Sequence, residues 1–422
     1  MIKPQELKLK NGIDLIVIPQ KDSPSISVAV LARAGSAYET KNLNGISHFL
    51  EHMFFKGTKN RPTPMMIASE FESLGASFNA FTSRDLTAYW GKVAYPNGEK
   101  IMDLISDMYC NPLFDEKQIE KEKGVIIEEI NMYEDDPRYK VSQILERTMY
   151  GNQPAGWDVA GPKENIQKIT REDFIKYRTQ HYNTLKSFLV VAGNIDVKTA
   201  LAWGNKYLSS IKQGKIIKPQ KFSDSQTKPA FGYKFRELDQ THFIMAFKAF
   251  SVFSKERFVL ALLSDIIGGG MSSRLFQKIR EELGAAYYVG SSPTLYGTHG
   301  YLDIFAGVNH GKSEIALKAI RDELQSIVKN GVTQQELDRV KEHRMGQFLL
   351  SLETSSDLAF YYGEQKVVTG KMMPPEEVIK NIKSVTKESI SRLAKQVLDN
   401  SKLNFAVIGP YKSINHFKKL LS

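Results

Sequence analysis

Two histidines and a glutamate near residue 50 have the types and spacing of a metal-dependent hydrolase. His48, Glu51 and His52 form the pattern H-x-x-E-H. Residues three and four apart are neighbours on a helix, so both imidazoles can reach one zinc ion while Glu51 points toward the same region. Zinc in an open site lowers the pKa of a bound water to about 7, and a nearby carboxylate can accept that water's proton. The alternative interpretation is a helix with two surface or capped histidines.

A site with two histidines needs a third ligand, for which the best candidate is Glu129. Glu122, Ile126 and Glu129 recur at helical spacing, so Glu129 shares a face with apolar residues. An ionised carboxylate turned toward a core needs a partner, and a cation would serve. Glu122, two turns earlier on the same face, could orient a metal ligand. The alternative is that Glu122, Glu128 and Glu129 form a solvated helix surface paired with lysines.

The chain resembles the pitrilysin-type inverzincin zinc metallopeptidases, in particular the short-subunit branch that contains the mitochondrial processing peptidase beta subunit and its bacterial homologues. H-x-x-E-H is the inverted thermolysin signature. Glu122 and Glu129 match the family's E-x6-E pattern, and 76 residues separate His52 from Glu129, the family's usual interval. The resemblance implies that His48, His52 and Glu129 bind one zinc ion per subunit and that Glu51 is the general base. Further segments that fit the family are 54–58, 74–80, 132–137, 161–166 and 191–194.

The second half of the chain offers a glycine-rich segment followed by an arginine and a tyrosine, namely Gly268, Gly269, Gly270, Arg280 and Tyr287. No phosphate-loop pattern is satisfied, and a flexible helix end is the alternative interpretation of the glycines. The resemblance implies that the glycines contact substrate and that Arg280 and Tyr287 reach the bound peptide, where they could bind the developing oxyanion. The alternative for Arg280 is a helix-surface salt bridge with Glu281 or Glu282.

Asn79 and Phe81 are the candidate substrate-binding residues of the first half. They lie in a strand-like segment that the resemblance places beside the zinc. An edge strand there could pair with an extended peptide, so that main-chain hydrogen bonds give affinity with little sequence preference. In the eukaryotic processing enzymes, as the resemblance implies, acidic residues after the third ligand read an arginine near the cleavage site. Tyr139 and Gln143 stand at the matching positions, so arginine-directed specificity does not follow.

The elements that must position these residues predict an α+β fold. Alternating or apolar runs predict strands, an Asn-Gly pair predicts a turn, and longer periodic segments predict helices that continue to about residue 148. We therefore expect a mixed, mainly antiparallel sheet with helices packed on one face. The predicted strands cover 8–19 (around the turn), 25–34, 76–81 and 85–94, and the first predicted helices cover 43–56 and 64–74.

This unit is predicted to occur twice. The segment 169–193 aligns with 385–409 at a constant offset of 216, and both copies read as a capped helix followed by an apolar strand that ends at glycine. The same offset places Ser264, Ile267 and Gly268 where the H-x-x-E-H residues stand, so the second copy has lost the metal. The predicted domains are a zinc-binding catalytic domain (1–213), a linker (214–230) and a homologous, substrate-contacting domain without metal ligands (231–422).

Composition fits a soluble enzyme of more than one domain. The chain has 422 residues, of which 42% are hydrophobic and 25% are charged. No signal peptide or long apolar run is evident, which predicts a cytoplasmic protein without a membrane partner. The formal charge of +10 is spread over both halves and interleaved with acidic residues. This distribution argues against a nucleic-acid partner.

Two functions of different classes remain. The first is a zinc endopeptidase that hydrolyses short or unfolded polypeptides in an enclosed chamber, with zinc-bound water as nucleophile and Glu51 as general base. The alternative is a non-catalytic structural or assembly subunit of the same family. Such subunits typically lose a ligand or the base, whereas this chain keeps all of them together with Arg280 and Tyr287. The expected partners are a peptide or unfolded polypeptide and a second subunit, either in a homodimer, the simpler expectation, or in a heterodimer with an inactive homologue.

Overall fold

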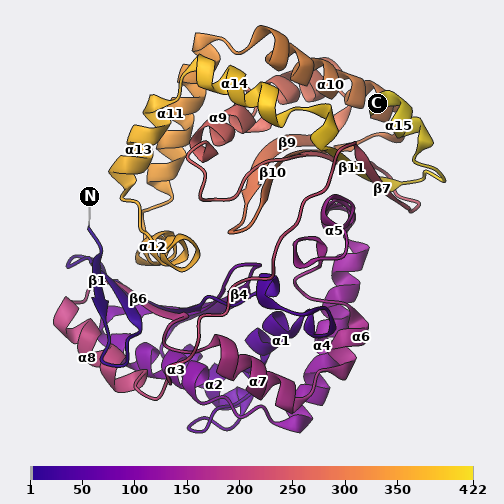
Figure 1. Cartoon of the computed structure of the whole chain (residues 1–422). Coiled ribbons are helices and arrows are strands. Elements are labelled where there is room, and N and C mark those ends of the chain that lie inside the picture. Colours follow the sequence, from indigo (N-terminus) through magenta and orange to yellow (C-terminus); the bar gives the residue numbers. More distant parts are fainter. Residues whose placement is uncertain (1–2, 422) are drawn as a thin grey trace. The chain divides into compact units, whose positions relative to one another are not determined.

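The computed structural model describes residues 3–421, which form two compact units (Figure 1). The first unit comprises residues 3–130, 158–220 and 349–375, and the second comprises residues 131–157, 221–348 and 376–421. Each unit contains one mixed sheet with helices. The predicted α+β fold with two sheet-containing domains is therefore confirmed.

The first unit is built on a six-stranded sheet with the order β1-β2-β6-β3-β5-β4. Neighbours β2 and β6 run parallel, and the other neighbouring pairs are antiparallel. Strand β6 is buried along its whole length, as its continuous apolar sequence predicts for a strand covered on both faces. The strands are β1 (Gln5–Lys8), β2 (Asp14–Pro19), β3 (Ser25–Ala32), β4 (Ser77–Thr82), β5 (Thr87–Ala94) and β6 (Ser187–Gly193).

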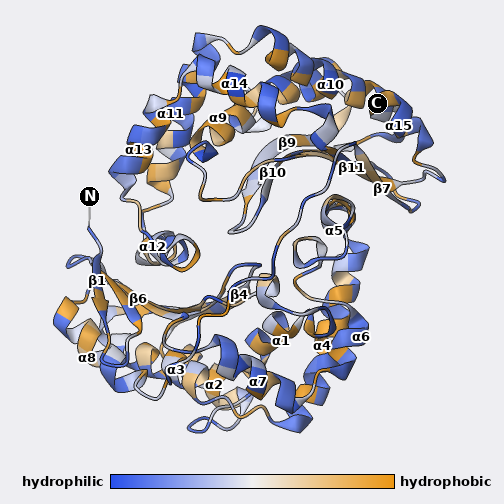
Figure 2. Ribbon diagram, in the orientation of Figure 1, coloured by the Kyte–Doolittle hydropathy of each residue, from blue (hydrophilic) through white to orange (hydrophobic). Residues whose placement is uncertain are grey.

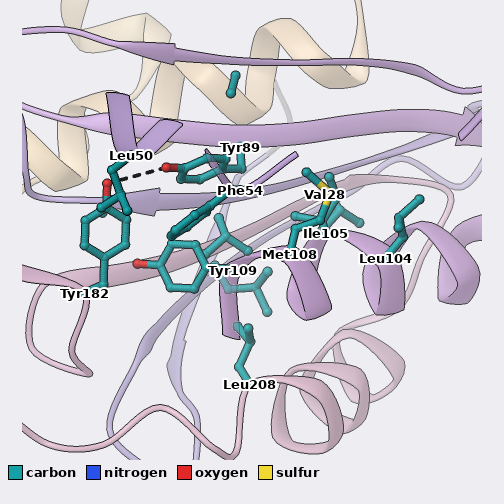
Figure 3. Close-up of a cluster of buried hydrophobic side chains, with 14 of the residues drawn as sticks. Val28, Leu50, Phe54, Tyr89, Leu104, Ile105, Met108, Tyr109, Tyr182 and Leu208 are labelled. Carbon is teal, nitrogen blue, oxygen red and sulfur yellow. Dashed lines mark hydrogen bonds between the residues drawn. The ribbon is translucent and has the colours of Figure 1, made fainter. Parts of the chain in front are cut away.

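Helices cover one face of this sheet and enclose a hydrophobic core, part of which Figure 3 shows around Phe54, Tyr89 and Tyr109. The strands of this sheet are largely coloured as hydrophobic in Figure 2, whereas the covering helices carry both colours, as amphipathic helices do. The helices that begin in this unit's first two segments are α1 (Ile46–Met53), α2 (Pro64–Ser73), α3 (Gly98–Cys110), α4 (Glu116–Asp135), α6 (Lys163–Lys168), α7 (Arg171–His181) and α8 (Val197–Tyr207).

The opposite face of the first sheet receives a single helix, α12 (Ser355–Thr369), from the far end of the sequence. Its buried residues Leu358 and Tyr362 pack against Ile16, Ala29 and Val190. From the sequence, we expected helices on one face of the sheet only. The helix on the opposite face was not expected, because the periodicity of residues 355–369 does not show which sheet this helix covers.

The second unit repeats this topology with a five-stranded sheet in the order β7-β11-β8-β10-β9. Here β7 and β11 are parallel and the other neighbours are antiparallel, as in the corresponding part of the first sheet. The strands are β7 (Ala230–Phe235), β8 (Thr241–Lys248), β9 (Ala286–Leu295), β10 (Gly300–Val308) and β11 (Leu403–Gly409).

The offset of 216 residues recurs in the strand bounds themselves. Strands β2, β3 and β6 each correspond to β7, β8 and β11 at that spacing, and the pairing Asp14↔Phe188 recurs as Ala230↔Asn404. The internal repeat predicted from residues 169–193 therefore extends to sheet order and register. The predicted linker at 214–230 divides the sequence into two halves, but the two compact units do not follow that division. The first unit includes residues 349–375 and the second includes residues 131–157, so the predicted linker remains a prediction.

The second sheet is likewise covered by a group of helices on one face and by helix α5 on the other. None of the helices in the described residues is long and apolar enough to span a bilayer. The helices that begin in this unit, or that join it from residue 334 onward, are α5 (Pro137–Tyr150), α9 (Arg257–Gly268), the π-helix η5 (Phe276–Glu282), α10 (Ser313–Asn330), α11 (Gln334–Leu350), α13 (Pro375–Ser384), α14 (Lys387–Val397) and α15 (Asn415–Leu421).

Candidate metal centre

Helix α1 holds the H-x-x-E-H residues on one face because its other face is fixed in the core. His48, Glu51 and His52 are each partly exposed. The side chains of the opposite face are almost fully buried and anchor the helix against the sheet and α7. These buried residues are Ile46, Phe49, Leu50 and Met53.

The N-terminus of α1 is capped by a buried carboxylate. Glu39 Oε1 accepts a hydrogen bond from the backbone N–H of Ser47 (2.8 Å), and Oε2 accepts from the N–H of Gly45 and from Asn44 Nδ2 (both 2.9 Å). Gly45 has a φ of 102°, and a Cβ at that position would lie 2.6 Å from the carbonyl oxygen of Ala160. Only glycine fits there. An acidic group at a helix N-terminus also complements the helix dipole, so the start of α1 is well defined.

A buried amine lies next to this cap. Lys186 Nζ is 2.9 Å from His181 Nδ1 and 4.1 Å from the centroid of the Tyr38 ring. Burial, with a smaller effect from the charge of Arg33, lowers the pKa of Lys186 to about 7. Burial and the nearby Lys186 lower the pKa of His181 to about 3. His181 is thus a neutral acceptor for the Lys186 amine.

A Lys186→Met substitution should remove a pH dependence of stability. The unfolded chain binds a proton at Lys186 up to a pKa of about 10.4, whereas the folded chain releases it near pH 7, so folding becomes more favourable as the pH rises between these values. Between pH 7.5 and 9.5, the wild type should gain about 2 kcal/mol of unfolding free energy relative to the variant. Thermal unfolding at the two pH values measures this. Equal pH dependence in both proteins would show that Lys186 is protonated in the folded state throughout this range.

The cluster of candidate zinc ligands joins α1 to α4. His48 Nε2 lies 3.6 Å and His52 Nε2 lies 3.4 Å from the same atom, Glu129 Oε2. One ligand atom from each of the three residues lies within 4.8 Å of the others, and no second group of this kind occurs in the described residues. The neighbouring Glu128 is exposed, whereas Glu129 is partly buried. The structure therefore brings together the three residues that the sequence proposed as ligands.

The donor set fits zinc. Ligand atoms about 2.0–2.2 Å from a tetrahedral zinc ion lie about 3.3–3.6 Å from one another, which agrees with the two nitrogen–oxygen distances to Glu129. These distances are too long for normal hydrogen bonds. Burial and the charge of His52 lower the pKa of His48 to about 4, so its imidazole is neutral, the form that binds a metal.

Glu122 and Lys56 orient the second histidine. Glu122, 2% exposed, accepts a hydrogen bond from His52 Nδ1 (2.9 Å) and pairs with Lys56 Nζ (2.7 Å). This contact leaves His52 Nε2 directed toward Glu129. Burial alone would lower the pKa of His52, but the neighbouring carboxylates of Glu122 and Glu129 raise it to about 9. Although burial opposes it, the bonds from His52 and Lys56 lower the pKa of Glu122.

Glu51 is held by a neighbouring strand. Thr82 Oγ1, at the end of β4, donates a hydrogen bond of 2.5 Å to Glu51 Oε2. Burial raises the pKa of Glu51, and the bond from Thr82 opposes that rise. Glu51 is not part of the three-atom cluster, in keeping with a role other than that of a ligand. A carboxylate with a raised pKa beside a metal site can accept and return a proton.

Strand β4 lies beside α1, but the two candidate substrate residues on it face away from the helix. Phe78 stacks on Phe71 of α2 at 3.8 Å, so the even-numbered residues of the strand face the helices of the core. Phe81 contacts Phe360 of α12 at 5.8 Å, and Asn79 is exposed. Strand β4 is an edge of its sheet. A role for Asn79 and Phe81 in binding peptide stays a prediction.

The candidate residues of the second half all lie in the second unit. Gly268 ends α9, where a Cβ would lie 2.5 Å from the backbone nitrogen of Ser291, so this glycine permits close packing on β9. Gly269 and Gly270 are exposed. Arg280 lies in η5 with its guanidinium 5.0 Å from the centroid of the Phe276 ring.

Arg280 and Tyr287 are both open to solvent in this unit. Tyr287 is 58% exposed on β9. The alternative interpretation of Arg280 as half of a surface salt bridge is not observed in the described residues, where Glu282 pairs with Lys278 instead.

Sequence reasoning missed three residues that position the site, Glu39, Lys56 and Thr82. Glu39 precedes the first residue of α1 by seven positions and matches no common capping pattern. Lys56 lies in a segment that was noted only for its likeness to the family. Thr82 could have been found, because a strict alternation along β4 puts it on the same face as Phe78 and Ala80.

Comparisons with known proteins match the chain to peptidase family models and to relatives named as zinc proteases. A family model described as Insulinase (Peptidase family M16) matches residues 15–163, and one described as Peptidase M16 inactive domain matches residues 168–343. A relative in Rickettsia bellii, named an uncharacterized zinc protease, is 35% identical and covers 96% of this chain and 97% of its own length. Another of that description in Bacillus subtilis is 33% identical, with coverage of 92% and 94%.

Solved structures share the fold over the full length. A protease from Helicobacter pylori superposes with a TM-score of 0.92 at 24% identity, covering 97% of this chain and 100% of that one. A Pseudomonas fluorescens protein described as a peptidase M16 inactive domain gives 0.90 at 20% identity, with coverage of 98% and 99%. At these identities the likeness shows the fold alone. The family follows from the relatives above 30% identity and from the two family models, and it is the one predicted from the sequence: the chain belongs to the M16 (insulinase) family of peptidases.

Proposed function

We propose that this protein is a zinc endopeptidase that hydrolyses short or unfolded polypeptides. The observation that supports it best is the convergence of His48, His52 and Glu129 within 4.8 Å of one another. A carboxylate outside that cluster, Glu51, lies on the same helix and is held by Thr82. Three protein ligands plus a separate base are the parts of a catalytic, rather than a structural, zinc site.

Each residue has a distinct part in this proposal. Zinc, when bound, supplies a Lewis acid that polarises the scissile carbonyl and acidifies the attacking water. Glu51 takes the proton from that water and passes it to the leaving amine, for which its raised pKa suits it. Glu122 fixes the orientation of His52. The intact set of ligands and base argues against the alternative of a non-catalytic subunit.

The proposal assigns substrate contacts to both sequence halves. Edge strand β4 would pair with an extended peptide through its main chain, which requires the substrate to be unfolded at the cleavage site. Arg280 and Tyr287, both exposed in the second unit, would bind the developing oxyanion or nearby carbonyls in an enclosed chamber. One zinc ion per subunit and a homodimer complete the proposal.

Substrate class is tested by presenting one segment in two states. An unfolded peptide of about thirty residues should be cleaved, whereas the same segment inside a stably folded protein should resist, because only an extended chain can add to a sheet edge. In the same assay, Arg280→Ala and Tyr287→Phe should lower turnover without changing bound zinc. Equal cleavage of the folded and unfolded forms would refute the substrate class. Full activity of both variants would show that Arg280 and Tyr287 take no part in catalysis.

A further inference from the structure

We propose that Thr82 is a positioning residue for the general base: its hydroxyl holds Glu51 in the orientation that faces the metal site and ties the base to edge strand β4. This inference rests on the proposed peptidase function. It adds a residue that neither the motif nor the family likeness had singled out.

The first ground is the geometry of the contact. Thr82 Oγ1 lies 2.5 Å from Glu51 Oε2, and within residues 3–421 it is the hydrogen-bond donor to this side chain. The Thr87 hydroxyl, 3.3 Å from Thr82 Oγ1, donates instead to the carbonyl oxygen of Ala34 at 3.0 Å. The proton of Thr82 is therefore directed at Glu51, since an ionised carboxylate can only accept.

The second ground is what a base requires. A glutamate side chain has three rotatable bonds, and holding it in one rotamer costs conformational entropy. A charge-assisted hydrogen bond to one carboxylate oxygen offsets that cost and leaves the other oxygen available to accept a proton. A misplacement of about 1 Å in a reacting group can lower the rate about a hundredfold. An enzyme whose Glu51 side chain is held in one orientation is therefore expected to have a higher kcat than one whose Glu51 rotates freely.

The third ground is the element that carries the hydroxyl. Thr82 is the last residue of β4, whose outer side has no neighbouring strand in the six-stranded sheet. The strand alternation turns its side chain toward α1, whereas Asn79 and Phe81 lie on the opposite face. The hydroxyl thus serves the base rather than the binding face, so its loss should lower kcat and leave KM unchanged.

The test uses the full-length zinc-loaded enzyme and a quenched peptide. Thr82→Val keeps the side-chain shape but removes the hydroxyl, and it should lower kcat about tenfold or more with the same KM and zinc content. Thr82→Ser, which keeps the hydroxyl, should recover most of that loss. Thr87→Val removes a neighbouring hydroxyl that does not contact Glu51, and it should retain wild-type kcat. Thr82→Ala is a second hydroxyl-free variant should the valine fail to fold.

A double-mutant cycle separates this inference from the function on which it rests. In a Glu51→Gln background, Thr82→Val should cause little further loss, because the base it positions is already gone. Wild-type kcat in Thr82→Val, a loss of bound zinc, or a full additional loss in the Glu51→Gln background would each overturn the positioning role while leaving the peptidase intact. Wild-type turnover of Glu51→Gln alone would instead overturn the proposed function.

Discussion

A Glu51→Gln variant is expected to bind zinc like the wild type and to lose about two or more orders of magnitude in turnover, the usual effect of removing a positioned general base. The amide has the shape of the carboxylate, and its carbonyl oxygen can still accept the Thr82 hydrogen bond. It cannot accept a proton from water at neutral pH. Zinc should remain because Glu51 lies outside the cluster formed by His48, His52 and Glu129.

The measurement is kcat on a quenched peptide together with zinc per chain by elemental analysis. Glu128→Gln is the matched control, since it makes the same chemical change at an exposed position on α4. It should behave as the wild type in both assays. Turnover of Glu51→Gln within a few-fold of the wild type would assign the base to another residue.

Glu129→Gln is expected to have the opposite signature, a loss of zinc. Removing an oriented outer partner of a metal ligand typically costs about ten- to a hundredfold in affinity, so replacing a ligand itself should cost about a hundredfold or more. A neutral amide is a poorer zinc ligand than a carboxylate, and the two histidines alone leave the ion weakly held. Activity should fall with the zinc content.

Competition with a chelator of known affinity gives the zinc dissociation constant, again with Glu128→Gln as the control. Excess zinc should partly restore the activity of Glu129→Gln but not that of Glu51→Gln, which separates ligand from base. Unchanged zinc affinity in Glu129→Gln would mean that the third ligand lies elsewhere.

Much of the candidate site is visible in the sequence because it depends on short-range periodicity. The spacing of His48 and His52 follows from one turn of helix, and the choice of Glu129 over Glu128 follows from the apolar residues that share its face. The repeat at 169–193 and 385–409 also predicted a second copy of the sheet, which recurs in strand order and register. Local patterns of this kind can be recognised in one sequence without comparison to others.

The sequence does not show which elements far apart in the chain contact each other. Strand alternation indicates the face on which Thr82 lies, but its hydrogen bond to Glu51, like the cap of Glu39 on α1, depends on how a strand and a loop pack beside that helix. The packing of α12 on the first sheet joins residues far apart in the chain, for example Ile16 and Tyr362. An amphipathic helix shows that it covers an apolar surface without specifying which one.

The most direct test of the account is to measure peptide hydrolysis as a function of bound zinc in the wild-type chain. Zinc is removed with a chelator and returned in steps, and both bound zinc and kcat are recorded at each step. We expect no hydrolysis in the metal-free protein and a rise in proportion to zinc that ends at one ion per chain. Hydrolysis by the metal-free chain, or none at one bound zinc per chain, would contradict a zinc peptidase centred on His48, His52 and Glu129.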